Sequence, residues 1–134
     1  MNEDLKAKLK EKFGAVVSEE QLDKVAGGSN GQNYEILNAM QKIDPQAVMD
    51  ITAQANQIQR TGDAEEDMRV AMNIIADGAK DLLQKHFGNE ISYVSTQKWH
   101  SNQYDSANGK PLTHKQVMQM INYKIELATW EIVN

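Results

Sequence analysis

The sequence contains no cysteine, carries more negative than positive charge and has no long uninterrupted apolar run. Without cysteine the chain can form neither a disulfide framework nor a thiolate metal site, and it has no cysteine nucleophile. Its N-terminus lacks the continuous apolar core of a Sec signal peptide, and no stretch reaches the apolar length of a membrane span. The chain has 134 residues, 40% of them hydrophobic, which suffices for one compact domain with a modest core.

The net negative charge of the chain limits the kinds of partner that it can bind without specificity. A formal net charge of -5 argues against nonspecific binding to nucleic acid or to anionic lipid, because both favour a dense Lys/Arg surface. Beyond residue 28 the chain has nine Lys/Arg and thirteen Asp/Glu, unlike the small cationic bacteriocins that permeabilise membranes. A folded effector or a receptor-directed signal suits this composition better.

No arrangement of residues in the sequence points to catalysis. The three histidines, His86, His100 and His114, lie fourteen residues apart, whereas helical metal pairs are spaced by three or four. The acidic run 65–67 fits the first turn of a helix better than a general acid/base pair. There is no glycine-rich phosphate loop after a strand. We therefore expect no enzyme activity, no cofactor and no metal. The segment with Trp99, His100 and Tyr104 could be a contact loop, but it could equally cover the core.

The first 28 residues predict two short amphipathic helices. Leu5, Leu9 and Phe13 recur every four residues among charged ones, and Gly14 can end that helix. Ser18 and Gln21 form a capping-box pattern that begins a second helix. The apolar face of this second helix comprises Val17, Leu22 and Val25.

Two glycines, Gly27 and Gly28, end the second helix, and residues 29–31 are predicted to be a flexible linker. The segment "SEEQLDKVAGG" resembles the double-glycine leaders of bacteriocins, peptide pheromones and related ribosomally made peptides. Counting Gly28 as the first position, Val25 is fourth, Leu22 seventh and Val17 twelfth, as in such leaders. The outermost apolar anchor usually lies at the fifteenth position, which is Gly14 here, so Phe13 at the sixteenth would have to serve.

The resemblance implies a precursor with a leader at 1–28 and an exported helical domain at 29–134. In that family a peptidase-containing ABC transporter cuts after the second glycine, here Gly28, with a papain-like cysteine peptidase domain. The leader helix would lie in a groove of the peptidase, with Phe13, Val17, Leu22 and Val25 as its recognition residues. The chain would be cytoplasmic as a precursor and secreted after leader removal, and an immunity protein is a further partner to expect.

Beyond the glycines, helical periodicity returns in four segments. The first is a helix over 34–43. The next helix begins after it, with Asp44 as a good N-cap and Pro45 as a good first residue. Asp63 should cap a longer helix that stops at Gly88. We expect an irregular connection over 89–111, because a short strand at 91–96 has no evident partner. A final helix, capped by Thr113 and Gln116, runs almost to Asn134.

These helices predict an all-α fold, a small helical bundle preceded by a mobile amphipathic leader. We expect 29–134 to fold without the leader. The final helix is apolar on more than one face, so it is either central to the bundle or docks on something else, and we favour a central place. Most of the seven methionines should fill the core.

Two alternatives remain open. The chain could be the precursor of a modified peptide, in which the leader also docks a tailoring enzyme; without cysteine, lanthionine chemistry is excluded. It could instead be a cytoplasmic helical protein-interaction module, in which Gly27 and Gly28 are only a helix C-cap and a turn.

Overall fold

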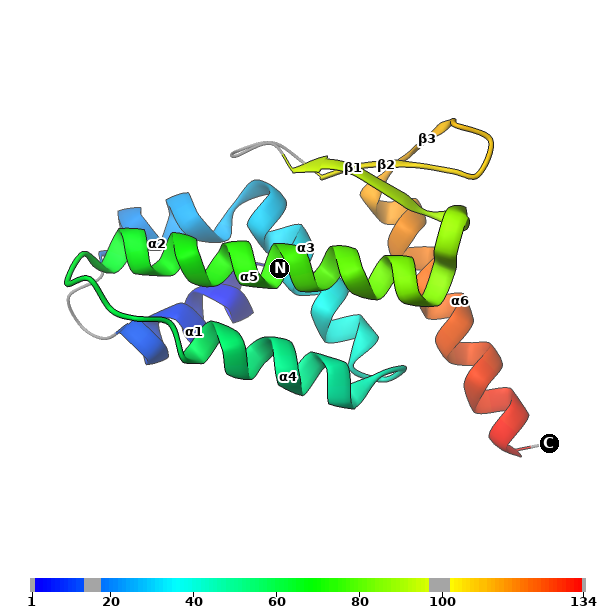
Figure 1. The fold of residues 1–134 in the computed structure, drawn as a ribbon, viewed down its shortest axis with the longest axis horizontal. Coiled ribbons are helices and arrows are strands. Elements are labelled where there is room, and N and C mark those ends of the chain that lie inside the picture. Colours follow the sequence, from blue (N-terminus) through cyan, green and yellow to red (C-terminus); the bar gives the residue numbers. More distant parts are fainter. Residues whose placement is uncertain (1, 14–17, 97–101, 134) are drawn as a thin grey trace.

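A computed structural model describes residues 2–13, 18–96 and 102–133. Within them the chain forms a helical bundle with one small antiparallel sheet, so the predicted all-α bundle is confirmed (Figure 1). The α-helices of this part are α1 (Asn2–Phe13), α2 (Glu19–Ala26), α3 (Gly28–Met40), α4 (Pro45–Asn56), α5 (Ala64–Phe87) and α6 (His114–Val133). A 3₁₀ turn (Gly88–Glu90) and the strands β1 (Ser92–Thr96), β2 (Asn102–Asp105) and β3 (Pro111–Leu112) separate α5 from α6.

Helix starts follow the capping residues that the sequence predicts. The side chain of Asp44 accepts from the backbone NH of Ala47, and Pro45 occupies the first turn of α4. Asp63 accepts from the backbone NH groups of Glu65 and Glu66 at the start of α5. Gln116 and Thr113 form the predicted capping box at the start of α6. These caps satisfy NH groups that a helix cannot pair internally, and they fix where each helix begins.

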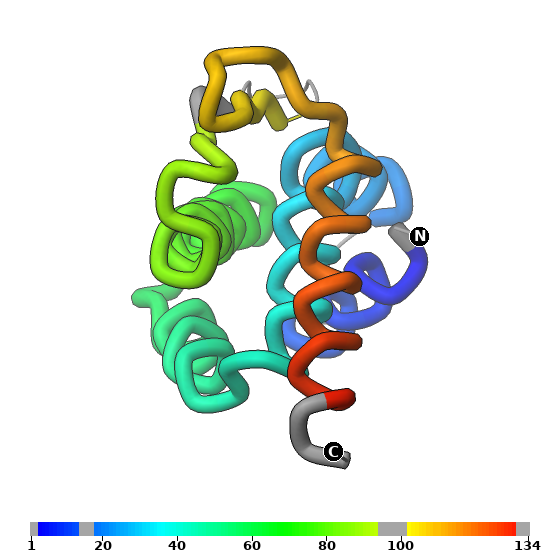
Figure 2. Tube along the Cα trace, turned by 90° about the vertical axis from the view of Figure 1, so that its right-hand side faces the viewer, coloured from blue at the N-terminus to red at the C-terminus, as the bar shows by residue number. Residues whose placement is uncertain are grey.

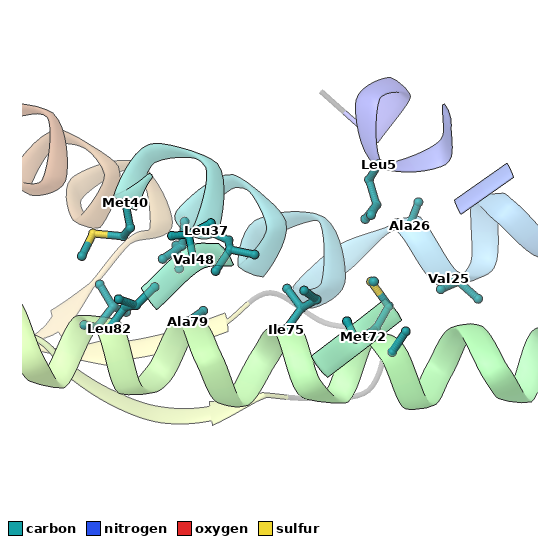
Figure 3. Packing of buried hydrophobic residues seen from close by; sticks show 14 of the residues in the cluster. Leu5, Val25, Ala26, Leu37, Met40, Val48, Met72, Ile75, Ala79 and Leu82 are labelled. Carbon is teal, nitrogen blue, oxygen red and sulfur yellow. The ribbon is translucent and has the colours of Figure 1, made fainter. Parts of the chain in front are cut away.

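The core lies along α5, which is flanked by α3 and α4 (Figure 3). Its predicted inward residues are all buried: Met68, Ala71, Met72, Ile75, Ala79, Leu82 and Leu83. They meet Ile36, Leu37 and Met40 from α3 and Val48 from α4 in one apolar cluster. Three of the methionines, Met40, Met68 and Met72, are buried there, whereas Met49 is exposed.

The polar segment after α5 corrects one prediction. It forms a hairpin, because β1 pairs antiparallel with β2, with a register irregularity between Tyr93 and Ser95. The strand order is β1-β2-β3, and the sheet lies at one edge of the bundle (Figure 2). The irregular connection expected over 89–111 is therefore wrong. The partner strand lies within the same polar segment, where too few apolar residues alternate to reveal it.

Helix α6 is not central, contrary to expectation. Val117 and Ile121 in its first half are buried, but Leu127 and Trp130 in its second half are exposed, Trp130 by 65%. The C-terminal end of α6 extends away from the other helices (Figure 1). Among the described residues, no helix combines the length and the apolar character that crossing a membrane requires.

Helix α4 packs closely against α5 at Gly78. A Cβ atom at this position would lie 2.6 to 2.8 Å from the side chain of Ile51, well inside van der Waals contact. We predict that Gly78→Ala destabilises the protein by about 1 to 2 kcal/mol, because overpacking outweighs the gain in helix propensity. Urea unfolding measures this. Asn73→Ala, at an exposed position of the same helix, is the control and should be neutral or slightly stabilising; equal effects of the two would contradict the close approach.

Candidate functional site

The predicted recognition helix forms as expected. The hydroxyl of Ser18 accepts from the backbone NH of Gln21 at 3.1 Å, and the backbone NH of Ser18 donates to Gln21 Oε1 at 3.0 Å. This confirms the capping box. Leu22 and Val25 share one face of α2, and each is only 1% exposed. Two of the predicted recognition residues are therefore buried in the folded chain.

Helix α1 is packed on the bundle through the residues that the sequence predicted as its apolar stripe. Leu5, Leu9 and Phe13 all belong to the core cluster. The ammonium group of Lys6 lies 2.7 Å from Asp23 and 3.2 Å from Glu19. Hydrogen bonds to these carboxylates raise the pKa of Lys6 above its ordinary value, and the bond to Asp23 has the larger effect. These ion pairs join α1 to α2.

Phe13, the predicted outer anchor, contacts Arg60 in the loop between α4 and α5. The guanidinium carbon lies 4.3 Å from the centre of the Phe13 ring, and the same side chain donates to the carbonyl of Lys12 at 2.9 Å. The cation lies over the ring face, where the quadrupole of an aromatic ring attracts it. Arg60 thus fixes the C-terminal end of α1. Val17, the fourth predicted recognition residue, lies outside the described residues.

The two glycines form the junction between α2 and α3. Gly27 ends α2 in an extended conformation, and Gly28 is exposed with a φ of 58°, a left-handed value that favours glycine. The side-chain amide of Asn30 donates to the carbonyl of Val25 at 2.8 Å and closes the C-terminal end of α2. The proposed cut after Gly28 therefore falls at the first residue of α3.

Two expectations about this region are wrong. Residues 29–31, predicted to be a flexible linker, are the first turn of α3, and Ser29 and Gly31 are buried. The described part of segment 1–28, predicted to be mobile, contributes Leu5, Leu22 and Val25 to the same core as α5. The reason is that an amphipathic helix buries its apolar stripe on any apolar surface within reach, and this bundle offers one. That residues 29–134 fold without segment 1–28 stays a prediction.

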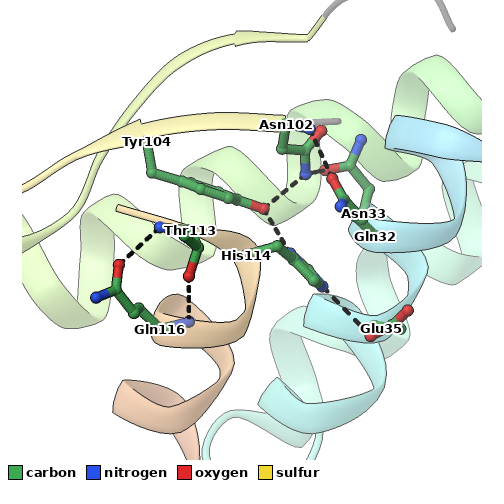
Figure 4. A network of polar contacts seen from close by, with 8 residues as sticks. All are labelled: Gln32, Asn33, Glu35, Asn102, Tyr104, Thr113, His114 and Gln116. Atoms are coloured by element: carbon green, nitrogen blue, oxygen red, sulfur yellow. Dashed lines mark hydrogen bonds and ion pairs between the residues drawn. The ribbon is translucent and has the colours of Figure 1, made fainter. Parts of the chain in front are cut away.

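A second group of polar residues joins α3, β2 and α6 (Figure 4). The hydroxyl of Tyr104 lies 2.9 Å from His114 Nδ1, and His114 Nε2 lies 3.3 Å from a carboxylate oxygen of Glu35. On the other side, the amide of Asn102 donates to the Tyr104 hydroxyl at 2.8 Å and to the Asn33 side-chain oxygen at 2.7 Å. We call these five residues the polar network.

The network also reaches β1 and the first turns of α3. Tyr93 donates through its hydroxyl to the side-chain oxygens of Asn33 and Asn102. Gln32 accepts from the backbone NH of Asn102 at 2.6 Å. The rings of Tyr93 and Tyr104 meet edge to face, with centroids 5.5 Å apart. Polar residues that resemble a linker in the sequence thus anchor the sheet to the helices.

The tyrosine hydroxyls in and beside the network are held in their protonated form. Burial raises the pKa of Tyr93 to about 12 and that of Tyr104 further still, so both hydroxyls stay protonated near neutral pH. Tyr104 is buried almost completely, only 1% exposed. Neither Asn33 nor Asn102 carries a sequence signal for this role, because the network joins segments about seventy residues apart.

The remaining histidines have separate surroundings. His86 at the end of α5 lies 2.9 Å from Asp44, which also pairs with Lys85 at 2.7 Å. The hydrogen bonds from Lys85 and then His86 lower the pKa of Asp44 to about 2. His100 and Trp99, proposed as part of a contact loop, lie outside the described residues, and Tyr104 of that group is buried. No cluster of three or more potential metal ligands occurs in the described part of the chain.

Comparison with known proteins assigns the chain to no family. No family model matches it, and neither a curated protein nor a solved structure is significantly similar to it. The function therefore has to be argued from the residues.

The polar network makes a prediction about stability. Tyr104→Phe leaves His114 Nδ1 and one NH of the Asn102 amide without their partner, and should cost about 1 to 3 kcal/mol of unfolding free energy. Tyr123→Phe is the matched control, because Tyr123 is 63% exposed, and it should change stability by less than about 0.5 kcal/mol. Chemical denaturation of both variants measures the difference. If Tyr104→Phe is as stable as the control, the network does not hold the sheet.

Proposed function

We propose that this chain is the precursor of a secreted bacteriocin-like or signalling protein, cut after Gly28 and exported by a peptidase-containing ABC transporter. The observation that carries the proposal is the junction itself. Leu22 and Val25 share one face of a capped helix that ends directly at Gly27, and Gly28 is exposed in a left-handed conformation. Residues 29–134 would be the exported domain.

The chemistry would belong to the partner. The cysteine thiolate of its papain-like peptidase would attack the carbonyl carbon of Gly28, and the bond to the nitrogen of Ser29 would break as a histidine protonates the leaving amine. Water would then hydrolyse the thioester and free residues 1–28. Glycines suit this step because they let an extended chain pass through a narrow cleft.

Burial of the recognition face adds a requirement. Five apolar side chains hold α1 and α2 on the bundle: Leu5, Leu9, Phe13, Leu22 and Val25. Each of them, when fully buried, contributes on the order of 1.5 to 3 kcal/mol to the free energy of docking. The peptidase would therefore bind only the fraction of molecules in which α2 has undocked, and its apparent affinity would fall by that fraction. A newly made, incompletely folded chain is the better substrate.

The same burial favours a second candidate, the helical interaction module. In that case α1 and α2 are permanent members of the fold, and the exposed apolar residues of α6, Tyr123, Leu127 and Trp130, contact a partner. Mass spectrometry of the culture medium separates the candidates. The unmodified mass of 29–134 supports the export proposal, a shifted mass supports a tailored precursor, and retention of the whole chain in the cells supports the interaction module.

Recognition can be tested apart from docking by using a peptide of residues 1–35 as the substrate of the transporter's peptidase domain. Leu22→Ala and Val25→Ala should each lower kcat/KM about tenfold, because each removes an aliphatic anchor from the groove. Lys24→Ala, whose side chain is exposed on the same helix, should stay within about twofold. Equal losses at all three positions would rule out the helix-in-groove model.

The cut site makes a further prediction in cells. Gly28→Val should abolish release of the mature chain, because valine blocks the narrow cleft. Gly62→Val is the matched control: Gly62 also has a positive φ, 95°, so the variant carries similar backbone strain far from the junction. We expect the control to be processed and exported. Equal processing of both variants, measured by the mass of the secreted product, would overturn the leader assignment.

A further inference from the structure

A cavity of about 410 Å³ lies between α1 and α4, and α3 and α5 form its floor. The lining is mostly apolar and includes Leu9, Leu37, Met72 and Ile75. Residues at its edge are exposed, such as Met49 and the small Ala53 of α4, so the cavity opens to solvent. Its volume falls within the range of small-molecule sites, about 300 to 1,000 Å³.

The cavity lining is positively charged, whereas the chain as a whole is negative. Lys8 and Lys12, one turn apart on α1, are its charged members among the described residues, and no aspartate or glutamate lines it. The chain as a whole carries a net charge of -5. Asn38, Gln41 and Asn56 add polar groups that can bind a headgroup. An apolar floor with a cationic edge fits a ligand with a hydrocarbon tail and an anionic head.

We propose that this cavity binds a medium-chain fatty acid. The tail would lie on the apolar floor, and the carboxylate would lie beside Lys8 and Lys12. A peptide helix is a poor alternative, because it is about 10 Å across and this volume would hold only about one turn. An uncharged or cationic amphiphile would leave the two ammonium groups unpaired or repelled.

This binding site depends on the fold of the uncleaved chain and not on the export proposal. The two are nevertheless connected through α1. Removal of residues 1–28 takes away one wall of the cavity and both lysines, so the site belongs to the uncleaved chain. A bound fatty acid would contact Leu5 and Leu9 and hold α1 in its docked position.

The test is a titration of the full-length chain with decanoate below its micelle concentration, followed by NMR of ¹³C-labelled methionine methyl groups. Met49 and Met72 line the cavity, whereas Met68 and Met118 do not. We expect saturable binding of one ligand per chain that shifts the first pair and leaves the second in place. Affinity should rise roughly two- to fourfold per methylene from hexanoate to decanoate, until the cavity is full.

Charge reversal on α1 supplies matched controls. Lys8→Glu and Lys12→Glu should each weaken decanoate binding about two- to tenfold. Lys10→Glu makes the same change on the same helix at an exposed residue outside the lining, and should leave affinity unchanged. Ala53→Phe should fill the mouth of the cavity and abolish binding while the melting temperature changes little.

Three results would overturn the proposal. The first is that decanoate changes the chemical shifts of all the methionine methyl groups, or leaves those of Met49 and Met72 unchanged. The second is equal affinity for decanoate, decanol and decyltrimethylammonium, or an equal loss in Lys10→Glu. The third is binding only to vesicles of phosphatidylglycerol, with none to monomeric decanoate, which would identify a membrane surface as the source of the anionic headgroup.

Discussion

The apolar stripe of α5 is the surface on which α1 to α4 assemble. Its residues from Met68 to Leu83 recur at helical spacing and are buried, with α3 and α4 packed along them. Gly78 lets α4 approach closely, because a methyl group there would meet Ile51. One 24-residue helix with capped ends therefore sets the length of the bundle and the positions of its neighbours. Without that stripe, the shorter helices would have nothing on which to bury their own apolar faces.

The docked position of α1 and α2 follows from the same physics and creates a conflict. The residues that suit a peptidase groove, Leu22 and Val25, also suit the core of this chain. If the chain is the transporter substrate proposed above, folding and recognition would compete for one apolar face, and the outcome would depend on which surface the segment meets first. The ion pairs of Lys6 and the contact of Arg60 with Phe13 favour the docked arrangement. The cavity between α1 and α4 shows that this docking leaves part of the apolar surface uncovered.

The polar network positions the sheet by hydrogen bonds, whereas α1 and α2 are held by hydrophobic burial. Asn33, Asn102 and Tyr104 connect α3 to a hairpin that has little apolar surface of its own. Buried polar groups are costly unless they are paired, so each partner restrains the others. His114 and Glu35 extend the restraint to the first turn of α6. Lys124 and Ile125 still contact the bundle, whereas Leu127 and Trp130 farther along α6 are exposed.

Local patterns in the sequence determined the helices themselves. Ser18, Asp44, Asp63 and Thr113 mark real helix starts, and the inward residues of α5 are those that its periodicity predicts. Capping and periodicity act within a few residues, so a sequence displays them directly. Only the tertiary structure decided where α1 and α2 lie, that residues 29–31 are helical, that the polar segment after α5 forms a hairpin, and that the C-terminal end of α6 extends away from the bundle. Those outcomes depend on contacts between segments far apart in the chain, such as Asn33 with Asn102, and no local pattern encodes which of several available surfaces an apolar face or a polar side chain will meet.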